Sequence, residues 1–178
     1  MYPRRTIAGA LAALAGAVAL LTGPALALGY PAADPVEPAR DLLLWATVNV
    51  CDTAGHPDGM GVRGSMPGTG DRGDELFMRL QVQFFRRSDG TWRALRGADS
   101  GFVDLGHGAA RARQAGRTFT LMPPEAGQPA FLLRGVVTFD WRRDDDVVRR
   151  VHRITSAGHP GTAGADPEGF SAATCSIR

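Results

Sequence analysis

The segment from Glu75 to Arg87 alternates apolar and polar residues more regularly than any other part of the chain. Its apolar positions are spaced two residues apart and comprise Leu76, Met78, Leu80, Val82 and Phe84. Residues two apart share one face of a β-strand, whereas a helix groups residues that are three and four apart. The pattern therefore predicts an antiparallel strand with one face in the core and the other in solvent.

Further short runs with strand character are separated by turns rich in Gly, Pro and Asp. We expect nine strands, at 42–51, 59–65, 75–87, 91–95, 102–105, 117–122, 131–142, 147–155 and 170–177. Helical periodicity is confined to one turn near 109–115, so crossover helices for a parallel sheet are lacking. The predicted fold class is all-β, an antiparallel β-sandwich of about eight or nine strands.

The first 27 residues have the regions of a secretory signal peptide. Arg4 and Arg5 precede an uncharged run, and small residues stand at Ala25 and Ala27, where a signal peptidase reads. The run is shorter and richer in Ala and Gly than the ~20 strongly apolar residues of a spanning helix. We expect cleavage after Ala27, export by the Sec or the twin-arginine route, and a secreted, extracellular protein with no membrane attachment.

The remaining chain divides into two parts by composition. Residues 28–41 are Pro-rich and predict an extended leader. Residues 42–178 predict a single β-sandwich domain, which is long enough to bury a core.

The charged residues exclude several classes of function. All 20 basic residues are arginine, so no lysine is available as a Schiff-base former or a phosphate-loop residue. Loss of residues 1–27 removes Arg4 and Arg5 and brings the formal net charge from +2 to zero. A nucleic-acid-binding protein keeps a basic excess, so we expect no nucleic-acid partner.

Cys51 and Cys175 are the only cysteines. In an oxidising compartment an isolated pair forms a disulfide in most proteins. The alternative is a metal or redox pair, but the wide separation lacks the C-x-x-C spacing of such sites. We predict a disulfide that fastens the first strand to the last.

Several short motifs carry a resemblance to a known group of proteins. They are the run Val48 to Thr53, His56-Pro57, the box Arg63 to Gly68, and the ending with Gly158-His159, Asp166-Pro167 and Cys175. With these motifs the chain resembles a family of small exported actinobacterial proteins of unknown function. The resemblance implies a β-sandwich that is immunoglobulin-like in architecture only, and it brings no activity and no catalytic residues.

The tetrapeptide Ala-Gly-His-Pro occurs twice, at 54–57 and 157–160. Asp58 lies beside the first histidine, His56, and Asp166 lies near the second, His159. If strands 42–51 and 170–177 pair next to the disulfide, both tetrapeptides share one end of the sandwich. Imidazole and carboxylate groups gathered there would suit Zn²⁺ or Ca²⁺. The alternative is two turns whose His and Asp side chains bond to local backbone.

Four other patterns have simpler explanations than a functional site. Residues 68–73 match G-x-G-x-x-G, but a strand follows them instead of the helix that a dinucleotide needs. Residues 72–74 spell Arg-Gly-Asp, which this composition produces readily by chance. Residues 144–146 are three aspartates that we interpret as a polar turn rather than a cation site. His56 and Ser65 could act as base and nucleophile, but nothing orients them together.

The sequence therefore predicts a secreted, non-catalytic accessory or binding module of the cell envelope or extracellular space. We expect no cofactor, and the ligand or partner is open. The alternative is a metal-dependent enzyme or metal-binding protein that uses the His56/His159 end.

Overall fold

The computed structural model describes residues 42–178, so the predicted signal peptide at 1–27 and leader at 28–41 lie outside the described residues. The described chain forms eight strands in two antiparallel sheets that pack against each other. Their bounds are β1 Trp45–Thr53, β2 His56–Pro67, β3 Asp74–Arg86, β4 Thr91–His107, β5 Ala112–Thr120, β6 Phe131–Arg143, β7 Asp146–Ile154 and β8 Cys175–Ile177. The predicted β-sandwich is confirmed.

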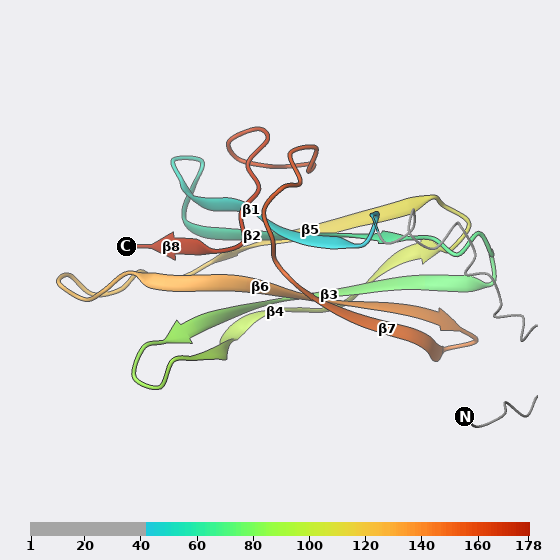
Figure 1. The fold of residues 1–178 in the computed structure, drawn as a ribbon, viewed down its shortest axis with the longest axis horizontal. Helices are drawn as coiled ribbons and strands as arrows, with labels where there is room; N and C mark the ends of the chain where they lie inside the picture. The colour runs from blue at the N-terminus through green and yellow to red at the C-terminus, as the bar shows by residue number, and fades with distance from the viewer. Residues whose placement is uncertain (1–41) are drawn as a thin grey trace, which may run out of the picture. The chain divides into compact units, whose positions relative to one another are not determined.

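The two sheets differ in size, as Figure 1 shows. One has three strands in the order β1-β2-β5. The other has five strands in the order β4-β3-β6-β7, with β8 paired to the beginning of β6 on the same side as β7. Strand β5 is therefore an edge of the first sheet and β4 is an edge of the second. The described residues include no helix that could span a membrane.

The core lies between the facing sides of the two sheets. Strand β3 keeps its predicted alternation, since Leu76, Met78, Leu80 and Val82 are each at most 1 % exposed. They pack against apolar side chains of β1, β2 and β6. The largest of these is Trp141, whose indole Nε1 donates a buried hydrogen bond of 2.9 Å to the Pro67 carbonyl. A buried tryptophan usually finds such a partner, and this one ties β6 to the end of β2.

Strands β2, β4 and β5 are longer than the sequence predicts. The predicted strands 91–95 and 102–105 are parts of one strand, β4, in which Gly97 and Gly101 adopt positive φ angles at irregularities of the ladder. The predicted helical turn near 109–115 is wrong, because residues from Ala112 onward belong to β5 and pair with β2. The apolar alternation is weak there because β5 is an exposed edge strand rich in Arg, Ala and Gly.

The C-terminal strand is shorter than predicted. Only Cys175–Ile177 forms β8, and it pairs with β6 instead of β1. Residues 155–174 run as an irregular segment over β1, which they meet at isolated bridges of Val48 with Ala172 and of Val50 with Asp166. Figure 1 shows this segment as the red loops above β1.

The disulfide joins the two sheets. Cys51 of β1 and Cys175 of β8 are bonded, with 5.4 Å between their Cα atoms. The bond thus fastens the first strand to the last, as predicted, although these two strands belong to different sheets.

Candidate functional site

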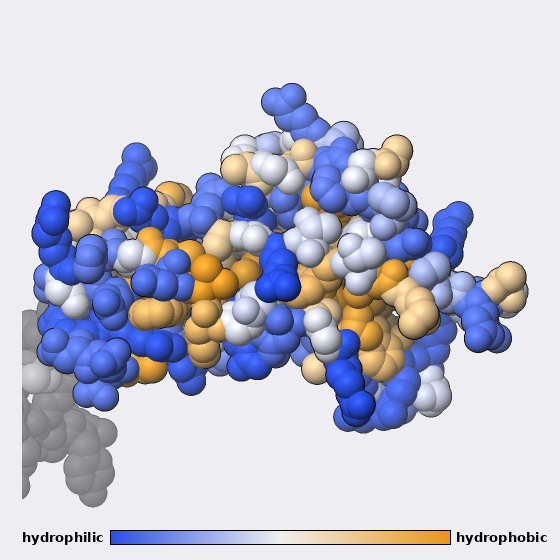
Figure 2. Space-filling model, turned by 180° about the vertical axis from the view of Figure 1, so that it is seen from behind, coloured by the Kyte–Doolittle hydropathy of each residue, from blue (hydrophilic) through white to orange (hydrophobic). Residues whose placement is uncertain are grey.

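A cleft opens between the two edge strands β4 and β5. Its volume is about 650 Å³, which lies within the ~300–1,000 Å³ typical of small-molecule sites. It is lined by Phe84, Leu95, Arg96, Gly97, Ala98, Arg117, Thr118, Phe119, Thr120, Leu121, Met122, Phe131 and Leu133. We call this space the edge cleft. Figure 2 shows the back of the molecule, where apolar surface gathers in patches between hydrophilic residues.

One wall of the edge cleft is a bulge in β4. Gln81 pairs with Asp99 and Gln83 pairs with Ala94, so the four residues 95–98 lie opposite Val82 alone. Extra residues cannot join the ladder and bend the strand away from it. Gly97, with φ of +82°, allows that bend. The bulge brings Leu95 and Ala98 to the cleft.

Asp99 anchors the end of this bulge. Its carboxylate accepts hydrogen bonds from Arg79 Nε at 2.9 Å and from Gln81 Nε2 at 3.0 Å, both on the neighbouring strand β3. It also accepts one from the Gly101 amide at 2.9 Å. The bonds from Arg79, ahead of the opposing effect of burial, hold the pKa of Asp99 below its ordinary value. The carboxylate therefore stays charged and keeps the wall in place.

The opposite wall comes from β5 and the residue after it. Phe119 is 6 % exposed and packs with the core, and the Arg117 guanidinium lies 5.6 Å from its ring centroid. The Leu121 amide donates a 2.9 Å hydrogen bond to the Asp58 carbonyl, which directs the chain beyond β5 along the cleft. Leu133 of β6, which is 1 % exposed, and Phe84 of β3 complete the apolar lining.

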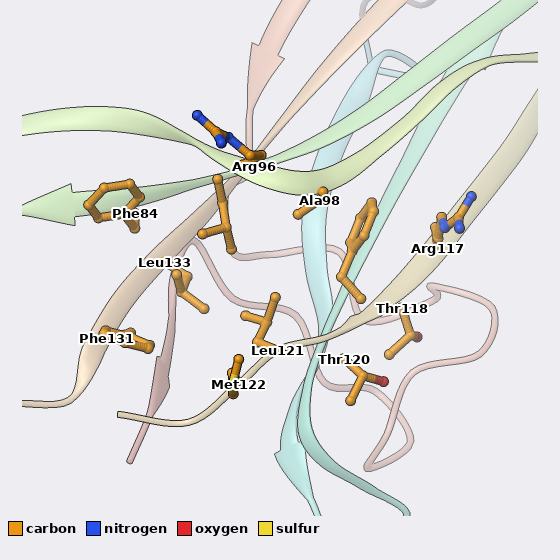
Figure 3. A pocket seen from close by; sticks show the side chains of 13 residues that line it. Phe84, Arg96, Ala98, Arg117, Thr118, Thr120, Leu121, Met122, Phe131 and Leu133 are labelled. Atoms are coloured by element: carbon orange, nitrogen blue, oxygen red, sulfur yellow. The ribbon is translucent and has the colours of Figure 1, made fainter. Parts of the chain in front are cut away.

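The two arginines stand at the rim of the edge cleft. In Figure 3 the guanidinium groups of Arg96 and Arg117 are directed away from the apolar centre, while Leu121, Leu133 and Ala98 surround it. Arg96 belongs to the bulge and Arg117 to β5. None of the ion pairs within residues 42–178 involves either of them.

A second hollow of about 620 Å³ adjoins the edge cleft. The two share Phe84, Met122 and Phe131, and the second continues along Pro123, Pro124, Pro129 and Leu132. Met122 is 86 % exposed although it is apolar. The apolar surface therefore extends as one groove beyond the cleft.

The predicted His56/His159 end is only partly assembled. His56 Nδ1 lies 3.0 Å from Asp166 Oδ2, and the Thr53 hydroxyl donates to the same oxygen. The Thr53 bond, followed by the His56 contact, lowers the pKa of Asp166. These contacts hold the segment before β8 against the β1–β2 turn.

His159 and Asp58 have other partners. The His159 ring stacks on Trp45 with 4.7 Å between ring centroids, and its burial lowers its pKa. Asp58 lies near the beginning of β2, where its own amide donates to Asp52 Oδ1 at 2.9 Å. Over residues 42–178, no three His, Cys, Asp or Glu side chains are grouped so that they could hold a metal ion. The structure thus brings together two of the four candidates, His56 and Asp166.

The glycine-rich motif at 68–73 is a tightly packed turn. A Cβ on Gly68 would lie 1.8 Å from the Ala110 carbonyl oxygen, so the backbone of residues 108–110 leaves no room for a side chain. The Gly70 amide donates to the Gly108 carbonyl at 2.9 Å. Strand β3 follows the motif, as the sequence predicts.

The Arg-Gly-Asp triplet does not present its aspartate. Asp74 is 3 % exposed and accepts a 2.8 Å hydrogen bond from Arg143 Nε. A hydrogen bond from Thr69, ahead of the contacts with Arg143, lowers the pKa of Asp74. The aspartate is therefore a structural anion and is not presented to a partner in an exposed loop.

The remaining two patterns are resolved by their places in the strands. Asp144 and Asp145 form the two-residue turn between β6 and β7, both with positive φ, as in a type I′ hairpin. His56 and Ser65 lie nine residues apart on β2, which separates them by roughly 30 Å. Ser65 is also buried, so this pair is not a base and nucleophile.

Sequence reasoning missed the edge cleft. Its wall depends on the register between β3 and β4, which no local pattern specifies. The one local signal is Gly97 between the apolar residues Leu95 and Ala98, because a glycine inside a strand often marks a bulge.

Comparisons with known proteins give no family. No protein-family model matches the chain, and no curated protein matches it. Among solved structures it is similar to the crystal structure of a Bacteroides uniformis β-glucuronidase, with a TM-score of 0.32 and 17 % identity. The match covers 63 % of this chain and 12 % of that chain, and a likeness this weak carries no argument about function.

Proposed function

We propose that this protein is a secreted, non-catalytic binding module and that the edge cleft is its binding site for a small apolar ligand. The observation that supports the proposal most strongly is the bulge of β4, which opens the sandwich between two edge strands. An ordinary edge would close over the core, but here Leu95, Leu121 and Leu133 line a space of about 650 Å³. Burial of an apolar ligand there removes water from these side chains, at roughly 25 cal/mol per Å².

Secretion is supported by the sequence of residues 1–27 and by the disulfide between Cys51 and Cys175. Disulfides persist in oxidising compartments. Expression with a detectable C-terminal tag, followed by N-terminal sequencing of protein from the medium, tests this part of the proposal. We expect a mature chain that begins at Leu28. A product that begins at Met1 and stays with the membrane contradicts it.

Ligand binding is tested with N-phenyl-1-naphthylamine, an uncharged apolar probe whose fluorescence rises in apolar surroundings. We expect saturable binding with one site per chain. The variant Leu121→Gln with Met122→Gln should weaken it at least fivefold, because both residues line the cleft.

The matched control is Leu42→Gln, since Leu42 is 79 % exposed and lies outside the lining. It should bind the probe as the unmodified protein does. Circular dichroism of both variants verifies the fold. If the probe does not bind saturably, or if both variants lose it equally, the edge cleft is not the site.

A further inference from the structure

The rim charges of the edge cleft have a single sign. Its lining includes Arg96 and Arg117 and no Asp or Glu. Most arginines of the five-stranded sheet are engaged: Arg79 with Asp99, Arg143 with Asp74, and Arg150 with Asp140. In contrast, no ion pair or hydrogen bond within residues 42–178 involves the Arg96 or Arg117 side chain. A cleft with charges of one sign at its mouth attracts the opposite charge.

These two arginines come from facing walls. Arg96 extends from the β4 bulge, and Arg117 extends from β5 on the opposite side. An anionic group at the mouth of the cleft would be attracted by both charges and could accept a charge-assisted hydrogen bond from either guanidinium group.

The apolar part of the groove is elongated and leads away from Arg117. In Figure 3 Phe84 and Phe131 lie on the side of the cleft opposite Arg117. From there the second hollow continues past Met122 and along Pro123 and Pro124. The arginines of that hollow are already engaged, since Arg86 pairs with Asp89 and Arg87 donates to the Ala130 carbonyl. The groove thus has available positive charge at the rim formed by Arg96 and Arg117, and apolar side chains continue from that rim past Phe84, Phe131 and Met122.

We propose that the ligand is a single-chain anionic amphiphile, a long alkyl chain ending in a carboxylate. The headgroup lies at the mouth of the cleft, beside Arg96 and Arg117, and the chain lies along Phe84, Phe131 and Met122. This inference rests on the proposed function, because it specifies the ligand class of the same cleft. Charge complementarity selects the headgroup, and the length of the groove selects a chain over a compact ring.

The test measures displacement of N-phenyl-1-naphthylamine by dodecanoate, dodecan-1-ol and dodecyltrimethylammonium, each below its micelle concentration. At low salt we expect dodecanoate to bind roughly tenfold more tightly than the alcohol, and the cation to bind most weakly. The preference for dodecanoate should shrink at 0.5 M NaCl, where the Debye length is about 4 Å.

The double variant Arg96→Gln, Arg117→Gln should abolish the preference, because it should weaken the binding of dodecanoate far more than that of dodecan-1-ol. The control Arg72→Gln, Arg153→Gln removes the same charge from exposed positions outside the cleft. It should keep the preference, which separates a local contact from an effect of net charge.

The outcomes distinguish this inference from the proposed function. Equal binding of dodecanoate and dodecan-1-ol, or a preference that survives in the double variant, overturns the inference while the apolar site remains. If the probe itself does not bind, the proposed function is contradicted. Arginine-dependent binding to phosphatidylglycerol vesicles without uptake of monomeric dodecanoate also overturns the inference, in favour of a membrane surface.

Discussion

Arg150 lies directly across from Asp140 in the pairing of β7 with β6 and binds both of its carboxylate oxygens, each at 2.6 Å. Asp140 is 0 % exposed, and Arg142 donates to it as well, at 3.1 Å. Phe102 covers this group from β4, with the Arg142 and Arg150 guanidiniums 4.9 and 5.5 Å from its ring centroid. A small polar network thus holds together the outer face of the five-stranded sheet.

The variant Asp140→Asn should destabilise the protein by about 2–3 kcal/mol. An amide cannot accept both hydrogen bonds from Arg150, and two guanidiniums then lack their anion. The loss stays below that of a fully buried pair because Arg150 is partly exposed. Urea unfolding at pH 7 measures it, with Asp146→Asn as the control, since Asp146 is exposed and its side chain makes no hydrogen bond within residues 42–178. Equal stability of the two variants contradicts the assignment.

Asp140 should also make stability fall in acid. Burial acts to raise its pKa, but the hydrogen bonds from Arg150 and Arg142 outweigh burial, and the pKa is lowered overall. A carboxyl whose pKa is lower in the folded state stabilises the protein fully above its unfolded pKa of about 3.9. That contribution disappears as the pH falls below about 4 and through the folded pKa. Asp140→Asn should therefore lose less stability than the unmodified protein between pH 5 and pH 2.

Gly68→Ala should cost about 2 kcal/mol or more, because the new Cβ would meet the Ala110 and Gly108 carbonyl oxygens at 1.8 and 2.4 Å. The obstacle is backbone, so the turn must move. Gly161→Ala is the matched control, since its Cβ meets nothing within 4 Å and its φ is not positive. Thermal unfolding of the two variants compares them. A neutral Gly68→Ala would mean that the loop contact of residues 68 and 110 is absent in solution.

The turn between β6 and β7 should be improved by Asp145→Gly. Asp145 has φ of +69°, a conformation that glycine adopts without steric cost and that type I′ turns favour. We expect a gain of roughly 0.5–1 kcal/mol. The same substitution one residue later, Asp146→Gly, lies in β7 and should cost a similar amount. A melting temperature that moves in the same direction for both contradicts this interpretation of the turn.

The local alternation of residues, together with the oxidising chemistry expected outside the cytoplasm, was sufficient to predict several parts of the fold. The alternation in β3 fixed which face enters the core, and the aspartates after Arg143 marked a hairpin. The disulfide followed from an isolated cysteine pair behind a predicted export signal. The first two depend on residues that are close in sequence. The disulfide depends on cysteine chemistry and can be predicted without knowing how the strands pair.

The candidate site could not be predicted because it depends on pairing. The residues around 95–98 do not indicate that Gln81 pairs with Asp99 and Gln83 with Ala94. The repeat of Ala-Gly-His-Pro suggested that His56 and His159 have equal roles, yet His159 stacks on Trp45 while His56 meets Asp166. Identical tetrapeptides occupy different surroundings because the irregular segment 155–174 positions only the second.

Removal of the disulfide should lower stability and loosen one segment first. Residues 155–174 have no strand of their own, and two of their bridges to β1, at Val48 and Val50, lie close to the bond between Cys51 and Cys175. The double variant Cys51→Ala, Cys175→Ala should lose about 2–5 kcal/mol, since the unfolded chain gains freedom. Below the unfolding transition, hydrogen exchange should accelerate at Asp166 and Ala172, whose amides bond to β1. Amides in the centre of β3 are the internal reference and should exchange as before. If the exchange rates rise uniformly across the sandwich, the bond stabilises the whole fold instead of holding this segment to β1.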